Sequence, residues 1–155
     1  MNRQRCLLIF FVLIWVAGLT RAASDVIYNE KADAKKQVSA AIARASHDHK
    51  NVVLDFGGNW CEDCHVLEAQ MEKPDLASLI VANFIVVNVD VGRFDKNLDL
   101  AAQYHVPLKK GVPALAVLDS HGKLLYSQEQ GEFENARSMT FESIKAFFEE
   151  WKPKK

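Results

Sequence analysis

The chain has 155 residues, of which 49% are hydrophobic and 25% are charged, with 19 Lys and Arg against 20 Asp and Glu. This near-neutral balance excludes the strongly basic composition that is typical of nucleic-acid-binding proteins. The length suits one domain with one hydrophobic core and leaves no room for a second domain of ordinary size.

The N-terminal segment has the pattern of a secretory signal peptide. Two arginines precede the apolar stretch Cys6 to Leu19, and Thr20-Arg21-Ala22 follows as a small-residue cleavage site. We expect a signal peptide at residues 1–22, cleaved after Ala22, a mature domain at residues 23–155, and a periplasmic or otherwise exported protein. The apolar stretch is shorter than the roughly 20 residues of a spanning helix, and an uncleaved N-terminal membrane anchor is the alternative.

Removal of this segment changes the charge and the cysteine content. It takes away three arginines, no acidic residue and Cys6, so the formal charge falls from −1 to −4. No nucleic acid is therefore expected as a partner. The two remaining cysteines, Cys61 and Cys64, form a closely spaced pair, which in an exported protein suits thiol–disulfide exchange better than stapling a fold.

Hydrophobic periodicity predicts alternating helices and strands along the mature chain. In chain order these are a helix over Ala32–Ala45, a polar loop over His47–Asn51, a buried strand over Val52–Phe56, a helix over Cys61–Met71 that ends before Pro74 and Asp75, a short helix around Leu76–Val81, a strand over Phe84–Val89, a helix over Asn97–Tyr104, two strands over Ala114–Leu118 and Lys123–Tyr126 joined by a hairpin turn, and a final helix capped by Thr140.

This order predicts an α/β fold. The first two strands should be parallel neighbours and the last two an antiparallel pair, so that helices cover both faces of a central mixed β-sheet. The segment Gln128–Met139 is polar and long for a connection between a strand and a helix. We therefore expect it to offer a surface for a partner.

The most informative motif is Trp60-Cys61-Glu62-Asp63-Cys64-His65, which follows the first predicted strand. Two thiols at this spacing, where a strand hands over to a helix, can form a small disulfide ring. The helix N-terminus favours the thiolate of the first cysteine. The motif therefore indicates a redox centre.

Three separated features resemble the thioredoxin superfamily, over about Ala32 to Trp151. The first strand running into Trp60-Cys61-x-x-Cys64 resembles the family's active-site turn, Gly111-Val112-Pro113 resembles its cis-proline loop, and Asp119 to Lys123 resembles the hairpin that follows. The resemblance implies a thioredoxin-like fold and a thiol-disulfide oxidoreductase. His65 and Pro74 are similar to the exported branch that includes the C-terminal domain of DsbD-type reductases.

The resemblance also implies the catalytic roles. Cys61 would be the attacking thiolate, and Cys64 the resolving thiol that attacks the mixed disulfide and releases the substrate. Asp55 falls where the family keeps a buried carboxylate, whose pKa is raised by desolvation and which can take the proton from Cys64. The alternative for Asp55 is an ordinary strand-end aspartate with a backbone partner.

Three residues are expected to meet the substrate. Pro113 is predicted to be cis, with Pro107 as the competing candidate, and the backbone of Val112 would offer strand-like hydrogen bonds to a bound segment. Trp60 would pack beside the disulfide and limit its access to water. The alternative for Trp60 is a plain core aromatic.

Glu62, Asp63 and His65 are candidates for tuning the redox direction. Acidic groups beside Cys61 oppose its thiolate and favour a reductant, whereas a protonated His65 acts the other way. Carboxylates also suit the first turn of any helix. We expect a monomeric protein-disulfide reductase that acts on protein thiols and disulfides and is recharged by a membrane electron donor, with no metal and no cofactor beyond its own redox-active disulfide.

Two other classes of protein stay open. The pattern Cys61-x-x-Cys64-His65 is also the attachment site of a c-type haem, although two buried strands and a facing proline loop have no role in a small cytochrome. A non-catalytic binding module with a thioredoxin fold is the second alternative. The intact cysteine pair argues against it, because a pure binder has no need of two thiols.

The sequence departs from the usual family pattern at a few positions. Gly57-Gly58 replaces the aromatic and small pair that often precedes the motif, and Ala114 stands where a hydroxyl residue often follows the cis proline. Val86 or Asn88 lies where cytosolic thioredoxins place a lysine close to the buried acid. These departures weaken the prediction of a general cytosolic-type thioredoxin role.

Overall fold

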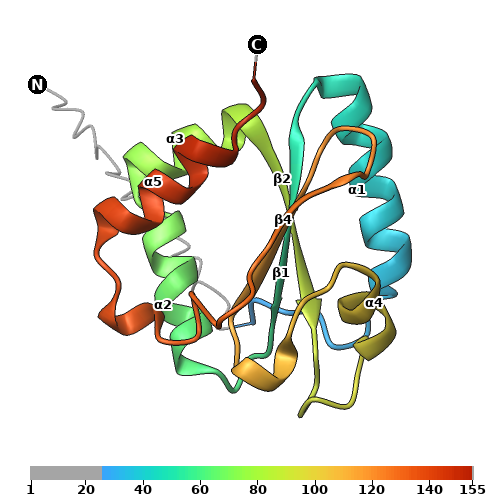
Figure 1. Cartoon of the computed structure of the whole chain (residues 1–155), viewed down its shortest axis with the longest axis vertical. Coiled ribbons are helices and arrows are strands. Elements are labelled where there is room, and N and C mark those ends of the chain that lie inside the picture. The colour runs from blue at the N-terminus through green and yellow to red at the C-terminus, as the bar shows by residue number, and fades with distance from the viewer. Residues whose placement is uncertain (1–25, 155) are drawn as a thin grey trace, which may run out of the picture.

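A four-stranded mixed sheet lies at the centre of the computed structural model, which describes residues 26–154 (Figure 1). The strands are β1 (Asn51–Gly57), β2 (Phe84–Asp90), β3 (Ala114–Leu118) and β4 (Leu124–Ser127), in the order β2-β1-β3-β4. β1 pairs in parallel with β2 and antiparallel with β3, and β3 pairs antiparallel with β4. The predicted α/β architecture is confirmed, whereas the predicted signal peptide at residues 1–22 lies outside the described residues.

Helices cover both faces of the sheet. They are α1 (Ala34–Asp48) and α4 (Leu98–Gln103) on one face, and α2 (Glu62–Met71), α3 (Pro74–Asn83) and α5 (Phe141–Trp151) on the other, with short 3-10 turns η1 (Leu108–Lys110) and η2 (Ala136–Ser138) (Figure 1). Within residues 26–154, no helix has both the length and the apolar character that crossing a bilayer requires.

The central strand β1 is buried on both sides. Successive side chains of a strand point to opposite faces, and here Val52, Leu54 and Phe56 join the cluster under α1 and α4, while Val53 joins the cluster under α2, α3 and α5. This double burial explains why β1 is a nearly continuous apolar run. Asp55 is the exception, a carboxyl group in the middle of a buried strand.

Helix α1 extends three residues beyond its predicted end at Ala45 and reaches Asp48. The polar residues at its C-terminus do not break it, because they face solvent and stabilise the last turn. Arg44 Nε lies 3.4 Å from the Asp48 carboxylate one turn later. The helix ends at His49, whose backbone is left-handed (φ 55°) and whose N–H bonds to the Ala45 carbonyl.

Pro74 begins α3, and does not simply terminate the preceding helix as predicted. It occupies the first turn of α3, where a missing N–H removes no helical hydrogen bond. The short helix expected at Leu76–Val81 is consequently longer at both ends. The predicted cap of the final helix is confirmed, since Thr140 Oγ1 accepts a hydrogen bond from the Ser143 N–H at 3.1 Å.

The segment Gln128–Met139 is anchored in the core. Gln128, Phe133 and Ala136 are buried, and Gln128 Oε1 accepts a hydrogen bond of 3.1 Å from the Leu115 N–H on β3. The polar residues around Phe133 and Ala136 in the sequence gave no indication that these two side chains are buried. The role of this segment as a partner surface remains a prediction.

We expect Phe148→Ala to lower the free energy of unfolding by about 3–5 kcal/mol, because it leaves a cavity in the core. Phe148 is fully buried and packs edge-to-face against Phe84 and Phe147, with ring centroids 5.5 and 5.4 Å away. Denaturant titration monitored by circular dichroism gives the value. Val81→Ala on the same layer is the control, since Val81 is 70% exposed, and equal losses in the two variants would contradict this account of the core.

Candidate functional site

Cys61 and Cys64 form a disulfide where the chain passes from β1 into α2. Their Cα atoms are 5.2 Å apart. Cys61 is the N-cap of α2, and its Sγ accepts the Cys64 N–H at 3.1 Å, so the sulfur lies at the positive end of the helix. Cys61 is 5% exposed and Cys64 is fully buried. A substrate can therefore reach only the Cys61 sulfur.

The cis-proline loop lies against the disulfide. The Val112–Pro113 peptide bond is cis, whereas Pro107 does not form a cis bond, so the prediction for Pro113 is confirmed. The Val112 carbonyl oxygen lies 3.4 Å from Cys61 Sγ. Two segments about fifty residues apart thus meet at the reactive sulfur. Binding of substrate to this loop stays a prediction.

Asp55 is buried in the middle of β1 and has an unusual environment. Its Oδ2 accepts a hydrogen bond of 2.9 Å from the Tyr28 hydroxyl, and its Oδ1 has no partner among the described residues. Burial raises the pKa of Asp55 to about 7, the bond from Tyr28 opposes this rise, and the nearby Glu68 adds to it. Asp55 is therefore not an ordinary strand-end aspartate with a backbone partner.

Tyr28 lies outside every motif and every helix or strand predicted from the sequence. Its side chain is fully buried, and burial, followed by the charge of Asp55, raises the pKa of its hydroxyl well above the usual value. Tyr28 precedes the first predicted helix, in a segment without periodicity. The resemblance gives the position of Gly57 an aromatic residue. Its absence here was the one sign in the sequence that an aromatic side chain from another segment could fill the space.

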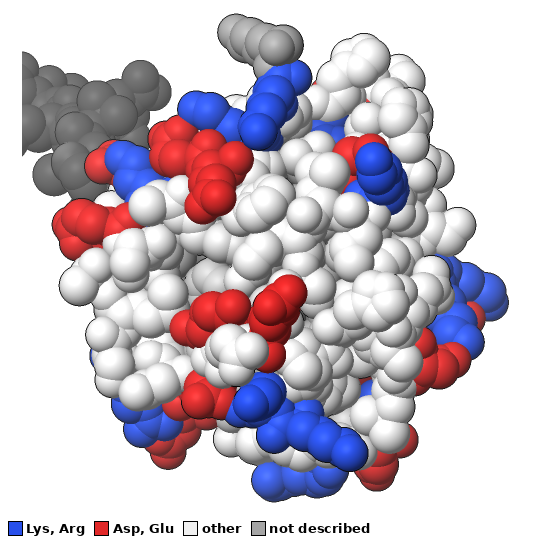
Figure 2. Space-filling model, in the orientation of Figure 1, with Lys and Arg blue, Asp and Glu red and all other residues white. Residues whose placement is uncertain are grey.

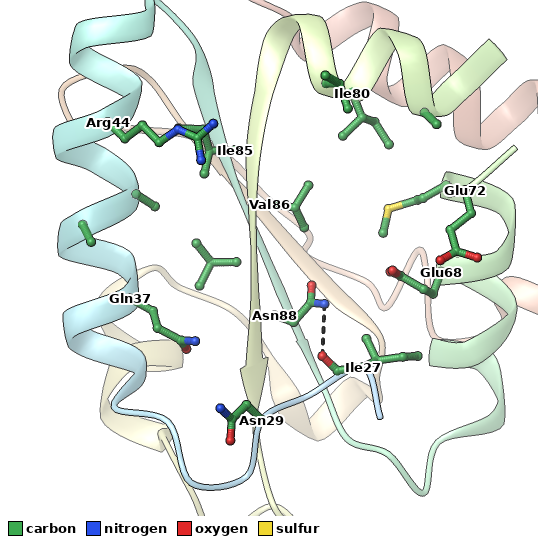
Figure 3. Close-up of a pocket in the computed structure, with 16 residues that line it drawn as sticks. Ile27, Asn29, Gln37, Arg44, Glu68, Glu72, Ile80, Ile85, Val86 and Asn88 are labelled. Carbon is green, nitrogen blue, oxygen red and sulfur yellow. Dashed lines mark hydrogen bonds between the residues drawn. The ribbon is translucent and has the colours of Figure 1, made fainter. Parts of the chain in front are cut away.

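A cavity of about 620 Å³ lies along β2, between α1 on one side and α2 and α3 on the other (Figure 3). Asn88 stands opposite Asp55 in the β1–β2 register, and its Nδ2 donates a 3.3 Å hydrogen bond to the Ile27 carbonyl. Figure 3 shows Glu68, on α2, and Glu72, the C-cap of that helix, beside the cavity. Burial, and next the charge of Glu72, raises the pKa of Glu68. The buried acid thus has an acidic neighbour, Glu68, and the amide of Asn88 stands opposite it in the sheet.

Trp60 is 38% exposed and is not a core aromatic, so that alternative was wrong. Its Nε1 donates a 2.6 Å hydrogen bond to the Gly92 carbonyl. Its ring packs edge-to-face with Phe94 at 5.6 Å and under the Arg93 guanidinium at 4.8 Å. These contacts hold the ring against the loop that follows β2. Shielding of the disulfide by Trp60 remains a prediction.

Arg137, which no sequence pattern indicated, pairs with the acidic residues of the motif. Its Nη2 lies 2.7 Å from Asp63 Oδ2 and its Nε 3.1 Å from Asp63 Oδ1, while its Nη1 lies 3.3 Å from Glu62 Oε2. The bidentate contact with Arg137 lowers the pKa of Asp63. The two acidic groups expected to oppose the Cys61 thiolate are therefore partly neutralised by one cation from η2.

His65 turns its ring toward the backbone. Its Nε2 lies 2.8 Å from the Asn59 carbonyl oxygen, so that nitrogen carries the hydrogen and donates it.

Charged side chains of both signs lie on the face shown in Figure 2. Basic side chains gather at its lower edge, the end where η1 and the start of α2 lie in Figure 1. Within residues 26–154, no three His, Cys, Asp or Glu side chains group closely enough to hold a metal ion.

Comparison with solved structures gives the same architecture. The disulphide isomerase from Xylella fastidiosa Temecula1 is 41% identical, with a TM-score of 0.78 over 83% of this chain and 98% of that chain. The reduced C-terminal domain of DsbD from Neisseria meningitidis is 21% identical, with a TM-score of 0.50 over 76% of this chain and 96% of that chain. At 21% identity this second likeness shows the shared fold alone.

Comparison of sequences identifies the family. The chloroplastic thioredoxin-like protein HCF164 of Oryza sativa subsp. japonica is 32% identical over 73 residues, which are 47% of this chain but only 26% of the rice protein. The chain thus spans about a quarter of that relative. Residues 33–120 match the family model described as thioredoxin-like. The chain belongs to the thioredoxin-like family, within the thioredoxin superfamily.

Proposed function

We propose that this protein is an exported oxidoreductase that reduces disulfides in protein substrates through Cys61 and Cys64. The observation that carries the proposal is the position of the disulfide at the start of α2, with one sulfur accessible, the other buried and the Val112 carbonyl 3.4 Å from the accessible one. Family membership supports exchange with protein thiols. Roles in substrate contact for Trp60, Val112 and Pro113 belong to the same proposal.

The proposed reaction starts from the reduced protein. The Cys61 thiolate attacks one sulfur of a substrate disulfide, forming a mixed disulfide and releasing the other substrate sulfur as a thiolate. The Cys64 thiol then gives its proton to the Asp55 carboxylate, and the resulting thiolate attacks Cys61 Sγ. The Cys61–Cys64 bond forms, the bond to the substrate breaks, and the second substrate thiolate leaves. Two electrons have passed to the substrate.

Reduction needs a source of electrons, and we infer a membrane donor that reduces the Cys61–Cys64 disulfide after each turnover. The signal-peptide pattern at residues 1–22 supports export, which would separate the protein from cytosolic reductants. Glu62, Asp63 and Arg137 together carry one net negative charge, which still disfavours the thiolate and supports the reductase direction.

Disulfide isomerisation is the second candidate function. It is favoured by the 41% identity to the Xylella fastidiosa protein described as a disulphide isomerase. An isomerase would rearrange a scrambled substrate without added reductant, because Cys61 attacks and is displaced again. A reductase would consume one reducing equivalent for each substrate disulfide, so stoichiometry separates the two functions.

The contacts around the motif favour exchange over haem attachment. A c-type haem would need both thiols for thioether bonds and a ring nitrogen of His65 for iron. Here the two sulfurs are bonded to each other, and His65 Nε2 donates to the Asn59 carbonyl. An absorption band near 410 nm in purified protein would overturn this part of the proposal.

We expect Cys61→Ser to abolish reduction of a protein disulfide, because the accessible nucleophile is lost. Cys64→Ser should instead accumulate a mixed disulfide through Cys61, since resolution requires the buried thiol. Mass spectrometry after incubation with a disulfide-containing protein measures both. Retention of wild-type turnover by Cys61→Ser would contradict the proposed function and favour a non-catalytic binding module.

We expect Asp55→Asn to be more stable than the wild type at pH 8.5 and similar to it at pH 3.5. The folded protein holds the Asp55 proton up to about pH 7, whereas the unfolded chain releases it near the ordinary pKa of 3.8. The stability that this proton provides is full below about pH 4 and is lost as the pH rises through 7. At about 1.4 kcal/mol per pKa unit, the difference at high pH is at most about 4 kcal/mol.

The measurement for Asp55→Asn is denaturant unfolding of both proteins across this pH range. Asp48→Asn is a matched control, because Asp48 lies on the surface of α1 and pairs with His47 and Arg44. If the free energies of unfolding of wild type and Asp55→Asn depend on pH in the same way, the pKa of Asp55 is not raised in the folded protein and the prediction is wrong.

We expect Arg137→Gln to make the reduction potential of the Cys61–Cys64 pair more negative, because Glu62 and Asp63 then oppose the thiolate without a neighbouring cation. A tenfold change in the exchange equilibrium corresponds to about 30 mV. The shift should be smaller than this and should shrink with added salt, since Arg137 is solvent-exposed. Equilibration with a thiol buffer gives the potential.

Arg44→Gln on α1 is the control for Arg137→Gln. An equal shift of the reduction potential in both variants would show that the effect comes from the net charge of the protein and not from the contact of Arg137 with Glu62 and Asp63. The wild-type value from the same titration tests the direction of the reaction. A potential near about −270 mV, as in thioredoxin, agrees with a reductase, whereas one near about −120 mV, as in strong exported oxidants, would reverse the proposed direction.

A further inference from the structure

The glycine at the end of β1 leaves a space that the Tyr28 side chain fills. A Cβ built on Gly57 would overlap the Tyr28 hydroxyl and would lie 2.8 Å from Cys64 Sγ. The Tyr28 hydroxyl and the buried sulfur therefore pack against the same bare stretch of backbone. The ring that fills this space comes from a distant part of the chain.

The same hydroxyl connects this space to the buried acid. It donates its hydrogen to Asp55 Oδ2 at 2.9 Å, and both side chains are almost completely buried. Among the described residues, this bond is the only hydrogen bond that the Asp55 carboxyl receives. The Tyr28 hydroxyl thus bonds to the Asp55 carboxyl and fills the space at Gly57 beside Cys64 Sγ, and all three side chains are out of reach of solvent.

Tyr28 is itself held by the active-site turn. The Tyr28 N–H donates to Asn59 Oδ1 at 2.9 Å, and Asn59 Nδ2 donates back to the Tyr28 carbonyl at 2.9 Å. Asn59 directly precedes the tryptophan of the redox motif. This reciprocal pair of bonds ties the N-terminal segment to the turn that carries the cysteines, and so fixes the hydroxyl relative to both.

The remaining ionisable groups that face this site are acidic. Glu68 approaches from α2 and raises the pKa of both Asp55 and Tyr28, and Asp90 at the end of β2 also raises the pKa of Tyr28. A negative charge on Asp55 is therefore opposed by burial and by Glu68. Of the groups that act on Asp55, only the Tyr28 hydroxyl favours the carboxylate.

We propose that Tyr28 is a positioning residue of the redox site, whose hydroxyl holds Asp55 beside Cys64 in the orientation and charge state that accept the Cys64 proton. This inference rests on the proposed function, since it concerns the resolving step. In that step the Cys64 proton goes to Asp55, the Cys64 sulfur bonds to Cys61 Sγ, and the substrate sulfur leaves with the electron pair of the broken bond. Without the hydroxyl, the buried carboxyl would have no donor and would keep its own proton at neutral pH, so fewer molecules would carry the carboxylate that accepts the Cys64 proton.

The test is Tyr28→Phe, which removes the hydroxyl and keeps the ring in the space beside Gly57. Stopped-flow mixing of reduced protein with a chromogenic peptide disulfide separates formation of the mixed disulfide from its resolution, between pH 5 and 9. We expect formation at wild-type rate, resolution at least about tenfold slower at pH 7, and a pH midpoint of resolution moved upward. General-base catalysis typically contributes about 100-fold to 10,000-fold, so a tenfold loss from a positioning residue is well within range.

Two controls separate positioning from packing. Tyr104→Phe removes the hydroxyl of another buried tyrosine, on the α4 side of the sheet, and should leave both rates unchanged. In an Asp55→Asn background, Tyr28→Phe should cause no further slowing, because the group that it positions is gone. A Tyr28→Phe effect that persists in that background, or a wild-type rate of resolution at every pH, would overturn the proposal.

A second variant tests the anchor. Asn59→Ala keeps every atom of Tyr28, Asp55 and the cysteines but removes the side chain that holds the Tyr28 backbone, and it should slow resolution in the same selective way. Unchanged resolution in Asn59→Ala would contradict the inference. If the wild-type protein itself fails to form a mixed disulfide with the peptide, the proposed function is wrong. If Tyr28→Phe forms and resolves the mixed disulfide at wild-type rates, only the role of Tyr28 is wrong.

Discussion

The buried carboxyl of Asp55 on the central strand is the constraint on which the rest of the site depends. β1 has a strand on each side and helices over both faces, so a side chain at this position is far from water. Burial without full hydrogen bonding favours the neutral acid and brings the pKa of Asp55 to about 7. A group that exchanges a proton near neutral pH is thus buried against Tyr28, whose hydroxyl packs beside Cys64, at a cost in stability that the surrounding core must offset.

The polar groups nearest to Asp55 on the sheet and on α2 are an amide and an acid. Asn88 stands opposite Asp55 in the sheet, and the nearby ionisable group on α2 is Glu68. An acidic neighbour keeps the proton on Asp55 to higher pH, whereas a cation would release it. The hydroxyl of Tyr28 is the compensating contact, and the bare backbone of Gly57 allows it to come this close to the sulfur of Cys64.

The accessible side of the disulfide is governed by a different set of contacts. The helix N-terminus favours the thiolate of Cys61, and the acidic residues of the first turn oppose it. Arg137, from the segment between β4 and α5, lies against these acidic residues and reduces their influence. That segment, polar by sequence but anchored by Phe133 and Ala136, therefore connects the surface beside the active site to the core under α5.

Local sequence determined the elements and the reactive pair. The apolar runs predicted all four strands to within one residue at each end, and the spacing of Cys61 and Cys64 indicated the disulfide. The resemblance at Gly111-Val112-Pro113, just before a buried strand, correctly indicated the cis proline. Each of these features depends on neighbours in the chain. Only the tertiary structure placed Tyr28 against Asp55 and Arg137 against Asp63, pairs separated by 27 and 74 positions. Hydrogen bonds and ion pairs between such distant positions follow from how helices and strands pack, and no periodicity or local motif records them. The sequence by itself therefore determined which chemistry the site can perform, and the packing decided which groups set its proton affinity and its charge.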